Sequence, residues 1–148
     1  MSDRVVLFIC VENACRSLMA EAMFNADPPA GWHATSAGTR PADAPNPRTG
    51  PMLREIGLEA PPHPPRLLTR EMMDDAKVRV TMGCLDDASC PVHLKTLKVT
   101  DWGLLDPAKL DDEGFRKVRD ELRSRVGGLV RELALLDRRN PFRPGRAT

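Results

Sequence analysis

Tyrosine is absent from this chain of 148 residues, and aromatic side chains of any kind make up only 4% of it. The formal net charge is +1, so overall charge gives no reason to expect binding to nucleic acid or to an anionic membrane surface. No apolar run approaches the roughly 20 residues needed to cross a bilayer, and residues 1–4 do not lead into the long apolar segment of a signal peptide. We therefore expect a cytoplasmic protein that binds neither nucleic acid nor membranes.

Cysteine is also scarce, with four residues in the chain: Cys10, Cys15, Cys84 and Cys90. A chain of this length can bury a sufficient core without disulfide support. In a reducing compartment thiols stay free, and they serve catalysis or metal binding more often than structure. The scarcity therefore argues against a disulfide-stabilised scaffold and makes the chemistry of each thiol the next question.

Short apolar runs alternate with helical patterns along the chain, which predicts βαβ units and a parallel sheet. We expect a single-domain α/β fold over residues 1–136, with a four-stranded, mainly parallel sheet flanked by helices, and a basic, flexible tail at residues 137–148. The predicted strands cover residues 5–9, 33–36, 78–82 and 97–100, and the predicted helices cover residues 17–25, 47–56, 69–75 and 111–136.

Cys10 follows the first apolar run, Val5–Ile9, and Arg16-Ser17 opens the helical segment that comes next. A buried strand brings such a thiol to the carboxyl edge of the sheet, where open α/β folds bind ligands. The free N–H groups and the positive dipole end of the following helix face the same point and favour a phosphate-like anion. This order of strand, thiol, loop and helix predicts a pocket for a tetrahedral oxyanion with a nucleophile at its base.

The side chains of this motif also suit that chemistry. The helix dipole and the Arg16 guanidinium both favour the thiolate, which is the nucleophilic form of Cys10. Arg16 can offer two donors to two oxygens of the anion, and the Ser17 hydroxyl can donate to the sulfur. An inert buried thiol is the usual interpretation of a lone cysteine that ends an apolar run. Here the strand, the spacing, the arginine and the following helix occur together, and this combination favours a nucleophilic thiol over an inert one.

Cys84 and Cys90 fall in a polar loop directly after the strand predicted at residues 78–82. In a parallel sheet that loop opens on the same edge as the Cys10 loop. Three thiols could then form a relay, in which one attacks a substrate and the next two pass on a disulfide. Two other interpretations stay open: a zinc site that includes His93, although no fourth ligand stands at a usual spacing, and two unrelated free cysteines.

Several motifs resemble those of one enzyme family. Residues 6–21 resemble the phosphate-loop signature of the low-molecular-weight tyrosine phosphatase fold, and Ser36–Thr39 resembles its second-strand motif. The thioredoxin-coupled arsenate reductase branch of that fold is indicated by residues 80–84, 90–91, 101–103, 106–107 and 115–121. The resemblance covers essentially the whole chain except the tail, and the two later cysteines are its most specific part.

The resemblance implies a phosphatase-like fold and an arsenate reductase without a cofactor. By analogy Cys10 attacks the arsenic of bound arsenate, and Asp106 is the general acid for the departing oxygen. Cys84 then attacks the Cys10 adduct, Cys90 resolves the resulting disulfide, and thioredoxin reduces the Cys84–Cys90 pair. The oxyanion, which phosphate or sulfate can mimic, is held by the loop residues Val11, Glu12, Asn13, Ala14, Cys15, Arg16 and Ser17.

The resemblance also bears on a metal ion, the reductant and the oligomeric state. Some members of the reductase branch bind a potassium ion near the loop, at positions that correspond here to Asn13, Glu21, Ser36 and a further carboxylate. Arg66 replaces that carboxylate, so we expect no metal ion and a positive charge from Arg66. The reductant is thioredoxin by resemblance, with glutaredoxin or another low-molecular-weight thiol left open. We also expect a monomer with a residual phosphatase activity.

The main alternative is a low-molecular-weight protein tyrosine phosphatase, which would use Cys10, Arg16 and Asp106 and let water hydrolyse a phosphocysteine. Phosphotyrosine pockets of this fold favour aromatic walls after the Asp-Pro pair, but here Ala108-Lys109 follows and the chain has no tyrosine. The two later cysteines would have no purpose in a phosphatase, which favours the reductase. A thiol redox sensor or binding module on the same scaffold is a third hypothesis.

Overall fold

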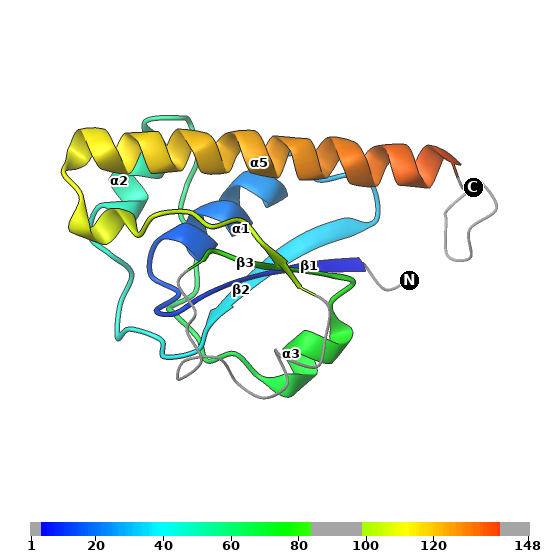
Figure 1. Cartoon of the computed structure of the whole chain (residues 1–148), viewed down its shortest axis with the longest axis horizontal. Coiled ribbons are helices and arrows are strands. Elements are labelled where there is room, and N and C mark those ends of the chain that lie inside the picture. The colour runs from blue at the N-terminus through cyan, green and yellow to red at the C-terminus, as the bar shows by residue number, and fades with distance from the viewer. Residues whose placement is uncertain (1–3, 84–98, 140–148) are drawn as a thin grey trace.

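The structure, a computed structural model, describes residues 4–83 and 99–139 (Figure 1). Cys84, Cys90 and His93 lie outside the described residues, as do residues 97–98 of the predicted fourth strand. The elements, in chain order, are β1 (Arg4–Cys10), α1 (Arg16–Ala26), β2 (Trp32–Gly38), α2 (Thr49–Arg54), α3 (Arg70–Asp75), β3 (Val78–Thr81), β4 (Thr100–Asp101), the 3₁₀ turn η1 (Pro107–Lys109) and α5 (Asp112–Arg139).

The four strands form one sheet in the order β2-β1-β3-β4, and every neighbouring pair runs parallel. This confirms the α/β class and the parallel sheet. β1 is the most deeply buried strand because it pairs with β2 on one side and β3 on the other. Because β1 ends at Cys10, the thiol lies at the carboxyl edge of the sheet, where the sequence predicted it.

The two faces of β1 supply two separate cores. Val6 and Phe8 belong to a large cluster with α1 and α5. Leu7 and Ile9 point to the other face and pack against Met73 of α3 in a smaller cluster. Alternate residues of a strand face opposite sides of the sheet, so this unbroken apolar run is buried on both. In Figure 1 α1 and α5 accordingly lie on one side of the sheet and α3 lies on the other.

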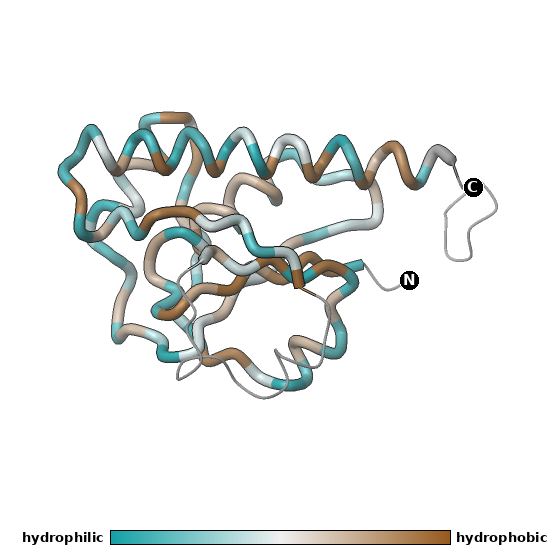
Figure 2. Tube along the Cα trace, viewed as in Figure 1, coloured by the Kyte–Doolittle hydropathy of each residue, from teal (hydrophilic) through white to brown (hydrophobic). Residues whose placement is uncertain are grey.

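Helix α5 is the longest element, and Figure 2 shows apolar and polar residues alternating along it. Its buried apolar side chains are Phe115, Val118, Leu122, Val126 and Leu133, which recur at the three- and four-residue steps of one helical face. The same spacing in the sequence predicts a packing face from Phe115 to Leu136; the face is buried as far as Leu133, whereas Leu136 is 48% exposed.

The end of α5 differs from its prediction. The helix runs to Arg139, past the boundary of 136 between domain and tail that the sequence suggested. The extension is held at Asp137, whose carboxylate accepts hydrogen bonds from both terminal nitrogens of Arg4, at 2.8 and 3.0 Å. Basic side chains near a helix C-terminus are compatible with its dipole, so the basic composition that marked a tail also suits the last turn of a helix.

Two other elements are shorter or shifted. Helix α2 covers residues 49–54 instead of 47–56, because its last turn tightens into short-range bonds and Gly57 takes a φ of 80°. The described part of the fourth strand is Thr100–Asp101 instead of residues 97–100. Both of its residues are exposed, and an exposed edge strand needs no apolar pattern. No helix among residues 4–83 and 99–139 is long and apolar enough to cross a membrane.

Candidate active site

The Cys10 sulfur is buried at the start of the loop between β1 and α1. Its Sγ lies 2.8 Å from the Ser17 hydroxyl, and the backbone N–H of Asn13 donates to it at 3.2 Å. Ser17 is at the N-terminal end of α1, so the helix begins against the sulfur. Two donors within reach of one sulfur stabilise negative charge there.

Four backbone carbonyls of the loop bond away from its centre. Those of Cys10, Val11, Glu12 and Ala14 accept hydrogen bonds from the backbone N–H groups of residues 39, 40, 42 and 46. Gly38 makes this close approach possible, since a Cβ there would meet the Val11 oxygen at 2.5 Å. With the carbonyls bonded outward, the N–H groups of the loop are available to an anion at its centre.

Asn13 fixes the curvature of the loop. It adopts a left-handed φ of 49° and is fully buried. Its amide nitrogen donates to the hydroxyls of Ser17 and Ser36, at 2.8 and 3.0 Å, and its amide oxygen accepts from the backbone N–H of Arg66 at 3.0 Å. Asparagine tolerates this backbone region better than most residues. Its side chain connects the loop to β2 and to the segment before α3.

Arg16 is buried, and its Nη1 donates to the carbonyls of Met82 and Leu104, at 3.2 and 2.7 Å. These carbonyls belong to the segments that follow β3 and β4. The bonds occupy one terminal nitrogen and leave Nη2 and Nε to face an anion, since a guanidinium has five N–H donors in a rigid fork. The prediction that Arg16 shares the pocket of Cys10 agrees with this geometry.

A cavity of about 420 Å³ joins these groups, and we call it the anion cavity. Its lining includes Cys10, Glu12, Cys15, Arg16 and Asp106. Outside the loop the lining also includes Ala42, residues 44–47, Ala108 and Lys109. The structure therefore brings the predicted nucleophile, arginine and general acid to one cavity, whose walls contain no aromatic side chain among the described residues.

Cys15 and Glu12 also line this cavity, but the structure gives neither of them the role of nucleophile. Burial raises the pKa of the Cys15 thiol to about 12, and nearby Asp106 and Cys10 raise it further against the lowering effects of Thr49 and Arg16. Cys15 is therefore a neutral thiol at physiological pH, unsuited to act as a nucleophile. The Glu12 side chain is exposed, so its charge is solvated beside the anion site.

Glu21 is the buried carboxylate behind the loop. It accepts a hydrogen bond of 2.6 Å from the Ser36 hydroxyl and lies 3.0 Å from His63 Nε2. Arg66 Nη2 stands 3.7 Å from the same carboxylate, and Arg66 Nε donates to the Ser36 carbonyl at 3.0 Å. His63 stands in a proline-rich stretch of the sequence that holds no signal for this contact.

These residues do not favour a potassium ion. The oxygen atoms that would bind a cation already have donors beside them, since the Asn13 amide oxygen accepts from the Arg66 N–H and the Glu21 carboxylate accepts from Ser36. The guanidinium of Arg66 also stands beside the carboxylate. Within the described residues no group of three or more His, Cys, Asp or Glu side chains could hold a metal ion.

The described chain before Cys84 ends beside this site. The Met82 carbonyl is bonded to Arg16, and a Cβ on Gly83 would meet the Cα of Gly103 at 2.5 Å. Gly83 takes a φ of 82°, so glycine is required both by conformation and by space. The described residues up to Gly83 therefore end at the carboxyl edge of the sheet, next to the arginine of the anion cavity.

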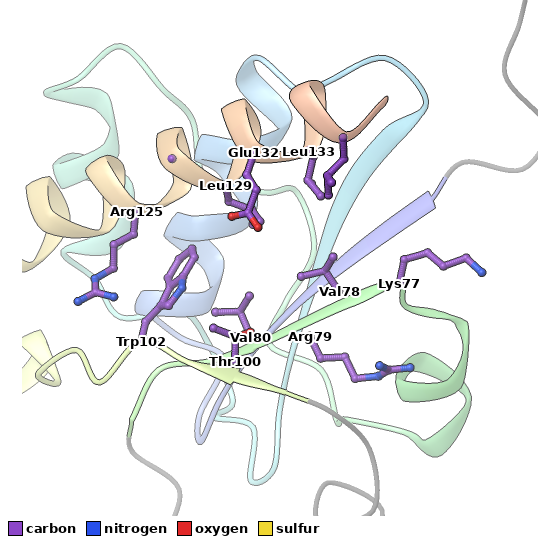
Figure 3. Close-up of a pocket in the computed structure, with 12 residues that line it drawn as sticks. Lys77, Val78, Arg79, Val80, Thr100, Trp102, Arg125, Leu129, Glu132 and Leu133 are labelled. Atoms are coloured by element: carbon purple, nitrogen blue, oxygen red, sulfur yellow. The ribbon is translucent and has the colours of Figure 1, made fainter. Parts of the chain in front are cut away.

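A second cavity, of about 510 Å³, lies between α5 and the strands β3 and β4; we call it the helix groove (Figure 3). Its lining includes the apolar side chains Val78, Val80, Trp102, Leu129, Leu133 and Leu136, together with the charged residues Arg125 and Glu132. Lys77 and Arg79 extend away from it in Figure 3. None of the predicted site residues among those described lines this groove.

Comparisons with known proteins agree with this fold and cavity. Residues 5–139 match the family described as low molecular weight phosphotyrosine protein phosphatase. Arsenate reductase 1 of Staphylococcus epidermidis is 32% identical over 126 residues, which cover 85% of this chain and 95% of the relative.

Two solved structures are also similar. One is an arsenate reductase in the phosphate binding state, with a TM-score of 0.76, 28% identity and coverage of 87% of this chain and 98% of the other. The second is a thioredoxin-dependent arsenate reductase of Corynebacterium glutamicum, with a TM-score of 0.74, 29% identity and coverage of 90% and 63%. The chain therefore belongs to the low molecular weight phosphotyrosine protein phosphatase family.

Proposed function

We propose that this protein is an arsenate reductase in which Cys10, Cys84 and Cys90 act in turn and thioredoxin supplies the electrons. The observation that carries the proposal is the convergence of Cys10, Arg16 and Asp106 on one cavity of about 420 Å³. Met82, two residues before Cys84 in the sequence, bonds to Arg16 through its carbonyl. The similarity to arsenate reductases supports arsenate as the substrate.

In the first step the Cys10 thiolate attacks the arsenic of bound arsenate. The loop N–H groups and the free edge of the Arg16 guanidinium hold the arsenate oxygens. Asp106 donates a proton to the departing oxygen, which leaves as water. A covalent bond between sulfur and arsenic(V) forms. The Ser17 hydroxyl and the Asn13 N–H, which both lie within hydrogen-bond reach of Sγ, stabilise the sulfur charge before the attack.

In the second step the Cys84 thiolate attacks the Cys10 sulfur. The sulfur–arsenic bond breaks, its electron pair stays on arsenic, and arsenic(V) becomes arsenic(III), which leaves as arsenite. Cys90 then attacks Cys84 and displaces the Cys10 thiolate. The dithiol of thioredoxin reduces the remaining Cys84–Cys90 disulfide with two electrons. Cys10 is ready for another arsenate after each cycle.

The remaining properties follow from the same proposal. The enzyme needs no cofactor, because its three thiols and thioredoxin account for both electrons. Phosphate and sulfate compete with arsenate for the loop, since all three are tetrahedral oxyanions. The protein acts in the cytoplasm as a monomer and supports resistance to arsenicals.

Three variants test the proposal: Cys10→Ser, Cys84→Ser and Cys90→Ser. Each is assayed for arsenate reduction with thioredoxin and for hydrolysis of an aryl phosphate. We expect all three to lose repeated turnover of arsenate, and only Cys10→Ser to lose any hydrolysis that the wild type shows. Full arsenate turnover by both Cys84→Ser and Cys90→Ser would eliminate the relay.

A phosphatase is the second candidate, favoured by the family that the chain matches. It would use the same cavity, with water in place of Cys84 as the second nucleophile. The small and proline side chains at residues 42–47 offer no aromatic surface to a phosphotyrosine ring. Efficient hydrolysis of a phosphorylated substrate, combined with no reduction of arsenate, would favour this candidate over the reductase.

A further inference from the structure

The loop that carries Asp106 follows β4, which ends at Asp101. Asp106 caps the short turn η1, since its carboxylate accepts a hydrogen bond of 3.0 Å from the backbone N–H of Ala108. The N–H of Leu110 donates to the Pro107 carbonyl at 3.0 Å. Both bonds lie inside the loop. They set the shape of the turn, but they do not hold Asp106 at any particular distance from Cys10.

Arg48, which follows the cavity-lining residues 44–47, supplies bonds to this loop. Its Nη2 donates to the carbonyls of Pro107 and Ala108, at 3.1 and 3.2 Å, and its Nη1 pairs with Asp112 at 3.2 Å. Within the part of the chain that the structure describes, no other side chain outside the loop donates to the carbonyls of residues 107–108. One guanidinium therefore holds two consecutive carbonyls next to Asp106.

Arg48 is itself fixed to the anion loop. Its backbone N–H donates to the Asn46 side chain at 2.9 Å, and the N–H of Asn46 donates to the Ala14 carbonyl at 2.9 Å. The Thr49 hydroxyl donates to the same carbonyl at 2.7 Å. The guanidinium carbon lies 4.7 Å from the centre of the Phe115 ring, a favourable cation–π distance. Arg48 thus joins the loop that binds the anion to the loop that carries the proton donor.

We infer that Arg48 is a positioning residue that holds the Asp106 loop over the Cys10 thiol. A general acid must come within hydrogen-bond reach of the leaving oxygen, and a displacement of about 1 Å can lower the rate by roughly 10²-fold. The inference rests on the proposed function, in which Asp106 is that acid. Arg48 acts through Asp106 and has no contact with the reacting atoms.

The kinetic test compares Arg48→Ala, Asp106→Asn and the double variant in arsenate reduction with thioredoxin. We expect Arg48→Ala to lower kcat roughly tenfold or more, with KM changed by less than about threefold, because positioning matters most in the transition state. In the Asp106→Asn background Arg48→Ala should lower kcat by less than about twofold, because the effects of two coupled residues are not additive. An equal loss in both backgrounds would overturn the inference.

Matched variants separate positioning from general damage. Arg116 also joins α2 to α5, through two bonds of 2.9 Å to Glu55, but it does not touch the loop. Arg116→Ala should keep wild-type kcat. Arg48→Lys should fall between wild type and Arg48→Ala, because an ammonium keeps the charge but cannot hold both carbonyls in the same fork. A wild-type kcat for Arg48→Ala would contradict the inference.

Amide hydrogen exchange tests whether Arg48 fixes the Asp106 loop, and it does not depend on an activity assay. Arg48→Ala should accelerate exchange at the N–H groups of Ala108 and Leu110 by roughly tenfold or more relative to Met52 in α2. Arg116→Ala should not. Unchanged exchange in Arg48→Ala would overturn the inference even if arsenate is reduced. A wild type that reduces no arsenate would instead refute the proposed function, and the double-variant comparison would then be made on hydrolysis of an aryl phosphate.

Discussion

The anion cavity and the helix groove have similar volumes, about 420 and 510 Å³, and both have apolar and charged residues in their walls. They differ in what is buried there. Arg16, in the wall of the anion cavity, is a buried guanidinium held by two hydrogen bonds. In the helix groove the charged residues Arg125 and Glu132 are exposed, and the buried lining residues, Val80 and Leu133, are apolar. Burying a polar group is costly unless its partners are in place. Volume therefore does not identify the site, whereas satisfied buried polar groups beside a thiol do.

The largest expected difference is in the reactivity of the two thiols that line the anion cavity, Cys10 and Cys15. With a pKa of about 12, Cys15 has a thiolate fraction of about 10⁻⁴ at pH 8. Its ionisation is reached only in strong alkali, because burial raises the pKa. An alkylating reagent at pH 8, followed by peptide mass spectrometry, should modify Cys10 at least roughly 100-fold faster than Cys15. Equal rates would show that the reactive thiol has been misassigned.

Arg16→Lys should have the next largest effect. Lysine keeps the charge but cannot bond Met82 and Leu104 while facing an anion with a planar fork. We expect kcat/KM for arsenate to fall by roughly 10²-fold or more. Arg125→Lys, at the edge of the helix groove, is the control and should leave kcat/KM within about twofold. Similar losses in both variants would remove the distinction between the two cavities.

Leu133→Ala tests whether the helix groove serves stability alone. Leu133 is buried against the core, so we expect the free energy of unfolding to fall by about 2–4 kcal/mol, as measured by denaturant titration. Leu136→Ala lies in the same groove at 48% exposure and should change it by less than about 0.5 kcal/mol. Both variants should keep wild-type kcat/KM; a specific loss of turnover would give the groove a catalytic part.

Gly128→Ala should have a smaller effect of the opposite sign. Gly128 lines the helix groove, and a Cβ there would meet no atom closer than Arg131 Nη2 at 3.9 Å. Alanine favours a helix interior over glycine by about 1 kcal/mol, so the free energy of unfolding should rise by about that amount. A lower stability in the thermal or denaturant unfolding curve would mean that the groove has less room than the structure gives it.

We expect no effect on stability or activity when potassium replaces sodium in the buffer. The thermal midpoint and kcat/KM of the wild type should stay constant, because Arg66 already stands beside Glu21. Arg66→Asp removes the guanidinium and adds a carboxylate, and its thermal midpoint should rise with potassium. A potassium-dependent midpoint in the wild type would contradict the description of this cluster.

The sequence was enough to predict those features of the molecule that are set by residues close together along the chain. Cys10 ends a strand and Arg16 begins the next helix, so the local motif was enough to predict that both side chains share one cavity. Asp106 required the family resemblance, because nothing local links it to Cys10. The apolar spacing of α5 predicted its buried face but not its last turn, which depends on the bond between Asp137 and Arg4 across almost the whole chain.

The contacts that the sequence missed all join distant segments. Arg48 bonds to residues 107 and 108, and His63 bonds to Glu21, so neither contact leaves a local pattern. Arg66 was noticed through a departure from a family motif, yet its bonds to Asn13 and Ser36 follow only from the fold. Long-range polar contacts need the tertiary structure, because the same arginine on a solvated surface would have the same sequence around it.

The central claim is that Cys10 begins a relay that ends on Cys84 and Cys90. The most direct measurement gives the fully reduced protein one equivalent of arsenate without thioredoxin, then quantifies arsenite and maps disulfides by mass spectrometry. The account predicts about one arsenite per chain, a Cys84–Cys90 disulfide and a free Cys10 thiol. Arsenate left unreduced, or arsenite released while Cys84 and Cys90 both remain thiols, would contradict it.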